Sequence, residues 1–155
     1  MQPNEPSECI PILAHTGMFS GFAPRDIADI LPCLRPCHRR YGKGEMVLWE
    51  GDTVTEIGVV LAGQARSLKT DLSGKTAIVT QFGQCSYIGV LLAASRRRPS
   101  PVSVQALTPL SALFFPMARI ILPCPRACEK HSRLLANILD GVAEKALVLH
   151  DRNDC

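Results

Sequence analysis

The chain of 155 residues is 46% hydrophobic and 20% charged, and its formal net charge is +3. This length suits one domain or one domain with an appended helix, and the apolar content excludes a disordered chain. The basic residues gather in two short clusters, 38–40 and 96–98, which excludes the broad basic face of a self-sufficient nucleic-acid-binding domain.

The cysteine content and the hydropathy pattern indicate a reduced, aqueous setting. There are seven cysteines, an odd number, and the first residues are polar and acidic rather than the start of a secretory signal. No apolar run approaches the roughly 18 residues that a membrane-spanning helix needs. We therefore expect a cytoplasmic protein with no membrane partner.

The chain begins with proline-rich and short helical segments. Residues 1–11 are predicted to be loose, within a lead-in segment 1–17, and residues 14–19 to form a short helical turn. A proline suits the first position of an amphipathic helix at Pro24–Leu34, although Pro32 favours a kink or the end of that helix. Its apolar residues recur at helical spacing, at Ile27, Ile30, Leu31 and Leu34.

From residue 39 onward the apolar pattern changes to short strands separated by turn residues. The segment Asp71–Lys75 is a strong signal for a hairpin loop. Short strands with turns at intervals of about eight to twelve residues are typical of a sandwich or jelly-roll barrel. We predict a mainly β fold with flanking helices, in which the strands form a double-stranded β-helix (jelly-roll barrel). The barrel and its N-terminal helices together are expected to span residues 18–124. The expected strands are Met46–Trp49, Ile57–Ala62, Ala65–Thr70, Thr76–Phe82, Val102–Ala106 and Leu110–Phe115.

The last segment, 125–155, is predicted to be one long helix from Arg126 to about Asn153. It follows a short helical turn at 117–122. Apolar residues spaced four, three, four and three apart form a coiled-coil seam, and others widen the apolar face enough to touch both a partner helix and the barrel. We expect a homodimer through this helix, the alternative being a helix packed only on its own domain. The seam residues are Leu135, Leu139, Val142, Ala146 and Leu149.

Several glycine-containing motifs lie between the predicted strands, and their order and spacing are more specific than any one of them. They are Arg40–Glu45 (RYGKGE), Glu50–Asp52 (EGD), Val60–Gly63 (VLAG), Asp71–Lys75 (DLSGK), Gly83–Gln84 with Ile88–Gly89, and Val104–Thr108 (VQALT). Together they resemble the sensor domain of the Crp/Fnr family of bacterial transcription regulators. The resemblance implies a cyclic-nucleotide-binding-like barrel, a phosphate-binding cassette at Gly83–Leu107 and a dimerisation helix after the barrel.

The cassette resembles that of the family in layout but not in its ligand-binding side chains. In the family's cyclic-nucleotide readers a glutamate follows the cassette glycine, and an arginine and a small hydroxyl residue further on pair with the cyclic phosphate. Here Val90 follows Gly89, and Ser100 and Pro101 stand where the arginine and the hydroxyl residue would be. Valine accepts no hydrogen bond, and proline has no backbone donor. We therefore expect an effector other than a cyclic nucleotide.

Apolar residues dominate the expected effector pocket. Such a pocket suits a small organic ligand, but the same side chains can equally fill it, and the sequence leaves both possibilities open. The run Arg96–Arg98 is expected to be a solvated loop face, with contact to an anionic ligand or partner as the alternative. The expected pocket residues are Ile88, Gly89, Val90, Leu91, Leu92, Ser100, Pro101 and Val102.

The cysteines and histidines are the residues that could support metal, redox or catalytic chemistry. The cysteine spacing is unusual for zinc or iron–sulfur ligands, and the dispersed histidines single out no haem ligand, so we expect no metal and no cofactor. Metal-binding cupins, which are enzymes with a similar barrel, carry a histidine pair beside a glutamate on their strands. The predicted strands of this chain carry no such group and no nucleophile motif, so we expect no enzyme. The candidates for a redox-switch disulfide are Cys33, Cys37, Cys124 and Cys128.

These observations favour one function. The chain is expected to be the sensor and dimerisation domain of a Crp/Fnr-type transcription regulator with an unknown small-molecule effector. DNA contact is expected only through a helix-turn-helix domain that this chain does not contain. The alternative is a stand-alone small-ligand or redox-sensing interaction module.

Overall fold

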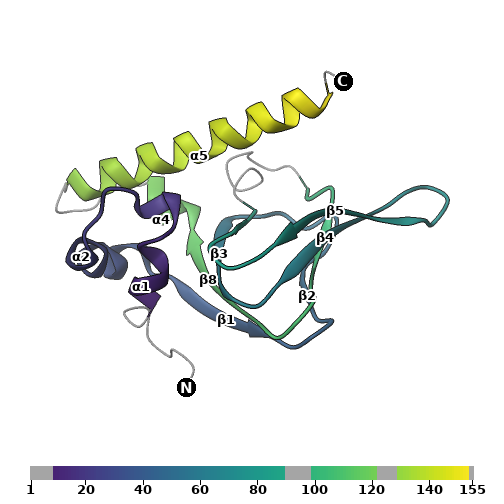
Figure 1. Ribbon diagram of the computed structural model, residues 1–155, viewed down its shortest axis with the longest axis horizontal. Helices are drawn as coiled ribbons and strands as arrows, with labels where there is room; N and C mark the ends of the chain where they lie inside the picture. The colour runs from purple at the N-terminus through teal and green to yellow at the C-terminus, as the bar shows by residue number, and fades with distance from the viewer. Residues whose placement is uncertain (1–8, 90–98, 122–128, 154–155) are drawn as a thin grey trace.

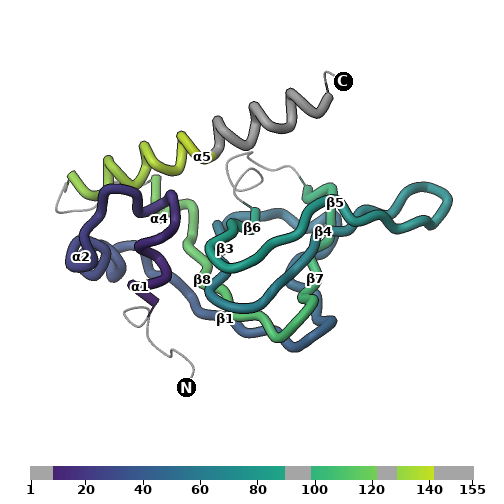
Figure 2. The backbone as a smooth tube through the Cα atoms, viewed as in Figure 1, coloured from purple at the N-terminus to yellow at the C-terminus, as the bar shows by residue number. Residues whose placement is uncertain are grey.

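The computed structural model describes residues 9–89, 99–121 and 129–153, with side chains described up to residue 141. Its strands are β1 (Cys37–Tyr41), β2 (Met46–Leu48), β3 (Glu56–Ala62), β4 (Ala65–Thr70), β5 (Thr76–Phe82), β6 (Tyr87–Ile88), β7 (Ser103–Ala106) and β8 (Leu110–Pro116). They form two four-stranded sheets, in the orders β1-β8-β3-β6 and β2-β7-β4-β5, and every pairing among these strands is antiparallel. Figure 2 shows the path of the backbone through these strands, with β6 and β7 labelled. The predicted mainly β, jelly-roll-like fold is therefore confirmed.

Helices flank this pair of sheets on one side. In Figure 1 the short helices gather at one end of the sheets, α5 runs from them along one side of the barrel, and the β4–β5 hairpin projects at the opposite end. The long C-terminal helix is confirmed from Glu129, and the three residues predicted before it lie outside the described residues. The helical elements are α1 (Ile10–Leu13), the 3-10 turn η2 (Gly17–Phe19), α2 (Pro24–Leu34), α4 (Met117–Ile121) and α5 (Glu129–Asn153).

Strand β3 is buried on both faces, which explains why it is apolar along nearly its whole length. Ile57, Val59 and Leu61 point to the helices, whereas Val60 points to the space between the sheets. Side chains alternate across a strand, so this one strand contributes to two separate cores.

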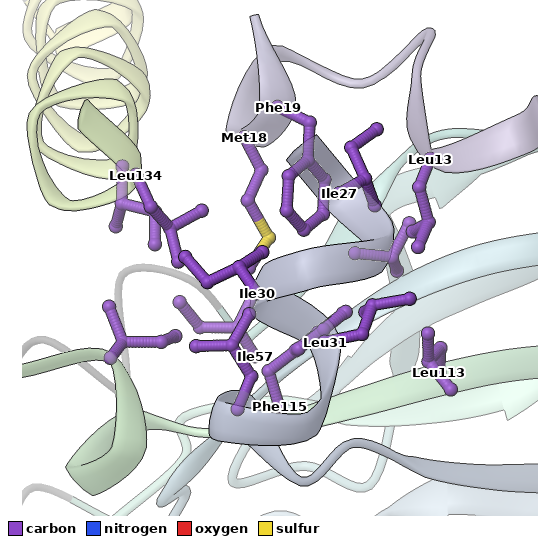
Figure 3. Packing of buried hydrophobic residues seen from close by; sticks show 14 of the residues in the cluster. Leu13, Met18, Phe19, Ile27, Ile30, Leu31, Ile57, Leu113, Phe115 and Leu134 are labelled. Carbon is purple, nitrogen blue, oxygen red and sulfur yellow. The ribbon is translucent and has the colours of Figure 1, made fainter. Parts of the chain in front are cut away.

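The larger core lies between the helices and the sheet that contains β3 and β8. Figure 3 shows Met18 and Phe19 of η2 and Leu134 of α5 gathered above Ile57 and Phe115 of the sheet. Leu134 is fully buried, so α5 is an integral part of this core. The smaller core, between the sheets, consists of Val60, Ala65, Ile88, Val104, Ala106 and Leu110.

Helix α2 has the predicted bounds and continues through Pro32. A proline inside a helix removes one backbone hydrogen bond, but here the loss falls in the last turn. The four predicted apolar residues of α2 are all buried in the larger core, and this burial offsets the missing bond. The helix ends at Leu34, and its C-cap residue Arg35 has a φ of 48°, which lies in the left-handed region.

The prediction of a loose lead-in through residue 11 is wrong at its end. Helix α1 begins at Ile10, and Cys9 and Leu13 are buried in the larger core. Pro11 fits there because the first turn of a helix needs no backbone donor at that position. The predicted turn at 14–19 is limited to the 3-10 turn at its second half.

A helix that spans a membrane must be both long and apolar. None of the helices in the described part of the chain combines the length and the apolar character needed to cross a bilayer.

Candidate functional site

The cassette begins where β6 ends. Gly89 has a φ of 79°, a left-handed conformation that glycine adopts without strain. A Cβ atom at this position would lie 2.9 Å from Cγ1 of Val54. The predicted glycine turn is therefore needed both for backbone conformation and for space. Val90, Leu91 and Leu92 of the expected pocket lie outside the described residues.

The return from the cassette is fixed to the turn at residues 50–52. Ser100 is 2% exposed; its backbone N–H donates to the carbonyl of Asp52 at 2.7 Å, and its carbonyl accepts from Gly51 at 2.8 Å. Its hydroxyl donates to the backbone carbonyl of Val102 at 2.6 Å. The hydroxyl thus stabilises its own loop, and the neighbouring Pro101 side chain is exposed.

A small pocket of about 100 Å³ lies beside this segment and includes Ile88 of the expected effector residues. Its one described cation, Arg39, forms an ion pair with Glu56 at 2.8 Å and lies 4.7 Å above the ring of Phe114. The hydrogen bonds to Glu56 raise the pKa of Arg39 above its ordinary value. Ligand pockets usually measure about 300 Å³ or more, so this space is small for a nucleotide and its cation is already neutralised.

A second set of contacts, which the sequence analysis missed, joins the cassette strand to α5. We call it the η2 joint: Tyr87 of β6, Met18 and Ser20 at η2, and Asn137 of α5. The backbone N–H of Met18 donates to the hydroxyl of Tyr87. The side-chain amide of Asn137 donates to the carbonyls of Met18, at 3.0 Å, and Ser20, at 2.9 Å.

The η2 joint holds polar groups in a largely apolar setting. Burial raises the pKa of the Tyr87 hydroxyl, an effect that the hydrogen bond from Met18 partly opposes. Asn137 lies between Leu134 and Ile138, which are both buried. A single amide in the apolar face of a long helix is the signal that could have revealed this contact.

Beside the η2 joint lies a pocket of about 400 Å³, lined by residues of η2, β3, β6 and α5. Among the expected effector residues that the structure describes, none lines it. This pocket therefore lies at the junction of the barrel with α5.

Comparison with known proteins decides the family. The model of the family described as "Cyclic nucleotide-binding domain" matches residues 38–121, which is more than half of the chain. The chain belongs to the cyclic nucleotide-binding domain family. The match covers β1 to α4, and therefore both sheets and the cassette.

Solved structures with the same fold as this cyclic nucleotide-binding domain include regulators of the Crp/Fnr type. The Streptomyces coelicolor regulator N-terminal domain is 18% identical, with a TM-score of 0.70 over 91% of this chain and 94% of that one. The sensor domain of the regulator DNR from Pseudomonas aeruginosa is 16% identical (TM-score 0.69, 93% and 90% covered). The Thermus thermophilus catabolite activator protein is 20% identical (TM-score 0.67) over 90% of this chain, which spans only 63% of that protein. No curated protein matched the sequence.

The predicted dimer seam is described only in part in this cyclic nucleotide-binding domain. Leu139 is 60% exposed, whereas Leu135 is half-buried against the larger core. The side chains of Val142, Ala146 and Leu149 lie outside the described ones. The exposed Leu139 is compatible with the predicted seam, which stays a prediction.

Of the four predicted redox cysteines, two are described. Cys33 is half-buried and Cys37 is exposed. Cys124 and Cys128 lie outside the described residues. Within the described ranges, no group of three or more histidine, cysteine, aspartate or glutamate side chains is placed to hold a metal ion.

Proposed function

We propose that this chain is the sensor and dimerisation part of a Crp/Fnr-type transcription regulator whose effector is not a cyclic nucleotide. The observation that carries the proposal is the η2 joint. It connects the strand that enters the cassette to the helix expected to form the dimer. In this proposal the domain binds and transmits a signal and catalyses no reaction.

The η2 joint supports transmission of a signal from the cassette to α5, because the backbone of η2 is hydrogen-bonded to both β6 and α5. Tyr87 accepts from the N–H of Met18, and Asn137 donates to the carbonyl of the same residue. A displacement of β6 therefore moves the Met18 backbone, and that backbone is attached to α5. Packed elements tend to shift between discrete arrangements rather than deform continuously, so a small shift at the cassette can change how α5 is held.

The effector is proposed to bind at the cassette through Ile88, Gly89, Val90, Leu91, Leu92, Ser100, Pro101 and Val102. The hydroxyl of Ser100 already donates within its own loop, and a proline side chain offers a phosphate no donor. These features favour a small ligand without a cyclic phosphate. A filled cassette, with the signal entering elsewhere in the domain, remains the alternative.

The dimer is proposed to form through Leu135, Leu139, Val142, Ala146 and Leu149 of α5. Leu139 is exposed in the middle of α5, whereas Leu134 and Ile138 of the same helix are buried against the domain. This exposed apolar side chain supports a partner helix at this face. DNA contact is assigned to a helix-turn-helix domain outside this chain, and the setting is the cytoplasm. The regulators among the solved structures of the same fold support this assignment.

The test is chromatin immunoprecipitation with the full-length gene product carrying an epitope tag. We expect enrichment of a limited set of promoters, and loss of that enrichment in a Leu139→Lys variant because half-sites need a dimer. A Leu72→Lys variant, which makes the same change at a fully exposed residue of the β4–β5 turn, is the matched control. A full-length product that enriches no DNA would overturn the proposal in favour of a stand-alone ligand-binding or redox-sensing module.

A further inference from the structure

The 400 Å³ pocket beside the η2 joint has the size and the chemical character of a ligand site. Its volume lies within the range of about 300–1,000 Å³ that is usual for small-molecule sites. We propose that this pocket binds a small organic molecule that carries a protonated amine. Binding here needs neither a dimer nor DNA, so the assignment goes beyond the proposed function and stands or falls separately from it.

The pocket lies on the other side of the sheet from the cassette interior. Ile57 of β3 and Tyr87 of β6 line it, and both belong to the face that packs against the helices. Ile88, the residue after Tyr87, belongs to the core between the two sheets. Because successive side chains of a strand point to opposite faces, a ligand in this pocket and a ligand in the barrel would be separated by the sheet itself.

Polar groups of the pocket mostly accept hydrogen bonds. Both amide hydrogens of Asn137 are used by backbone carbonyls, which leaves its Oδ1 as an acceptor without a donor in the described part of the chain. The carboxylate of Asp140 also lines the pocket, and none of the described lining residues is a lysine, arginine or histidine. A carboxylate and an amide oxygen recognise a protonated amine and repel a phosphate.

Apolar side chains supply the rest of the surface. Met18, Ile57 and Ile138 are buried residues of the larger core that also line the pocket. The Tyr87 hydroxyl accepts from Met18 and also interacts with the side chain of Thr16, so the Tyr87 ring contributes mainly apolar surface to the pocket. An apolar group attached to the amine would lie against the three core side chains, and this combination gives the ligand its orientation.

The pocket and the predicted dimer seam occupy different sides of α5. Each residue advances about 100° around a helix, so Asn137 and Gly141 share one side while Leu139, two residues from each, lies nearly opposite. Asn137 and Gly141 line the pocket, whereas Leu139 is exposed. A partner helix at Leu139 would therefore leave the pocket open to ligand.

The position of the pocket gives binding a regulatory consequence. Met18, Ser20, Tyr87 and Asn137 form the η2 joint and also line the cavity. A ligand that contacts several of these groups binds one arrangement of the η2 joint more tightly than another. It therefore raises the population of the arrangement that it binds more tightly. The amine would thus change how α5 is held against the barrel.

The experiment uses benzylammonium as the probe, with benzoate as a matched anion of nearly the same shape. Two-dimensional ¹H–¹⁵N spectra of the domain are recorded during titration with each. We expect benzylammonium to shift the backbone amide signals of Gly17, Met18, Tyr87 and Gly141 in a saturable way. Benzoate should shift these signals at least about five-fold less at equal concentration, because it meets the Asp140 carboxylate.

Three variants locate the binding. Asp140→Asn should weaken benzylammonium binding roughly two- to five-fold, as expected for an exposed charge pair. Glu129→Gln, which removes a like charge about 16 Å along the same helix, should leave it unchanged. Gly141→Leu should abolish the shifts, because a Cβ at Gly141 meets no atom within 4 Å and the leucine enters the cavity.

Gly141→Leu also controls for folding, since leucine favours a helix over glycine and the thermal midpoint should not fall. The proposal is overturned if benzoate binds at the same residues as tightly as benzylammonium. It is likewise overturned if Gly141→Leu retains the shifts, or if saturable shifts appear only at other residues. Loss of promoter binding in the full-length protein, by contrast, would leave this result untouched.

Discussion

Two glycines with the same backbone conformation have very different surroundings. Gly63, between β3 and β4, has a φ of 91°, and Gly74, in the β4–β5 turn, has a φ of 88°. A Cβ atom at Gly63 would lie 2.1 Å from the carbonyl oxygen of Pro109, whereas at Gly74 nothing lies within 4 Å. Only the first glycine is required by packing as well as by conformation.

Replacing each glycine by alanine should separate these two requirements. Gly74→Ala is expected to lower the free energy of unfolding by about 1 kcal/mol, the cost of a left-handed alanine. Gly63→Ala is expected to cost about 3 kcal/mol or more, because the backbone around Pro109 must also move. Urea denaturation of both variants measures the difference, and equal losses would contradict the close approach of the Gly63 turn to Pro109.

Tyr87 gives the domain a characteristic response to alkali. Its pKa is raised by burial, as is that of Tyr41, and the chain has only these two tyrosines. The unfolded chain therefore releases the tyrosine protons at a lower pH than the folded one. The neutral tyrosine hydroxyls make their full contribution to the free energy of unfolding below pH about 10. This contribution is lost as the pH rises through the raised pKa values of the folded state.

Tyr87→Phe should be less stable than the wild type by about 1 kcal/mol at neutral pH, because the Met18 N–H loses its acceptor. Above pH about 10 this difference should narrow, since the variant has one ionising tyrosine fewer. Urea denaturation at several pH values gives the measurement, with Tyr41→Phe as the control for the second hydroxyl. A difference that stays constant with pH would show that Tyr87 titrates normally.

Single residues also mark where sequence reasoning about the site ended. The turn at Gly89 could be predicted because glycine is the usual residue for a left-handed backbone conformation, whereas the place of Ser100 in an effector site stays a prediction. The η2 joint could not be predicted, because its hydrogen bonds join residues 69 and 119 positions apart. The amide in the apolar face of α5 marks Asn137 as a residue that needs a partner, but nothing in the local pattern identifies Met18 as that partner.

At the scale of elements, α5 presents one side to its own domain and another to solvent. Leu134 and Ile138 are buried and Leu139 is exposed. An isolated helix gains little from an exposed leucine, and a seam of about two heptads supplies a partner contact for it. The element thus has a structural side, which the described contacts define, and a side that is proposed to form the dimer.

Two lysine substitutions at adjacent positions test this division. Leu139→Lys should weaken the dimer and lower the weight-average sedimentation coefficient, because it places charge in an apolar seam. Asp140→Lys, about 100° further around the helix, introduces the same residue outside the seam and should leave the coefficient unchanged. An unchanged coefficient for Leu139→Lys would rule out the seam assignment.

Elements are predictable from sequence where their apolar pattern is strong. Helix α2 and strands β3, β4, β5 and β8 lie within one or two residues of their expected bounds. Strand β1 is not among the expected strands, because its sequence CHRRY has no alternating apolar residues; its pairing with β8 holds it in place. The two-residue strand β6 is too short to have a pattern of its own.

At the scale of the whole molecule, family membership and ligand choice must be separated. The match to the cyclic nucleotide-binding domain family covers both sheets. The proposal that the effector is not a cyclic nucleotide rests instead on described side chains, the paired Arg39 and the locally bonded Ser100. The fold identifies the architecture, and the side chains within it decide the ligand.

Isothermal titration with cyclic AMP tests this separation. We expect no binding heat at micromolar to submillimolar concentrations, because Ser100 and Pro101 stand where the family's phosphate-binding pair would be and the described cation beside the cassette, Arg39, is paired with Glu56. The same solution titrated into a family member that carries the glutamate and arginine serves as the positive control. Micromolar binding by this chain would show that the register assigned to Ser100 and Pro101 is wrong.

Strand β5 is the outer strand of its sheet, and within the described residues no other strand pairs with its free edge. Ile78 and Val79, on opposite faces, are both about half exposed, and the sequence TAIVTQF contains neither charge nor proline. Uncharged, β-branched edge strands are templates for intermolecular pairing. The colloidal behaviour of the purified protein should therefore be governed by this edge rather than by either core, and a lysine in place of Ile78 is the simplest change that would raise its solubility.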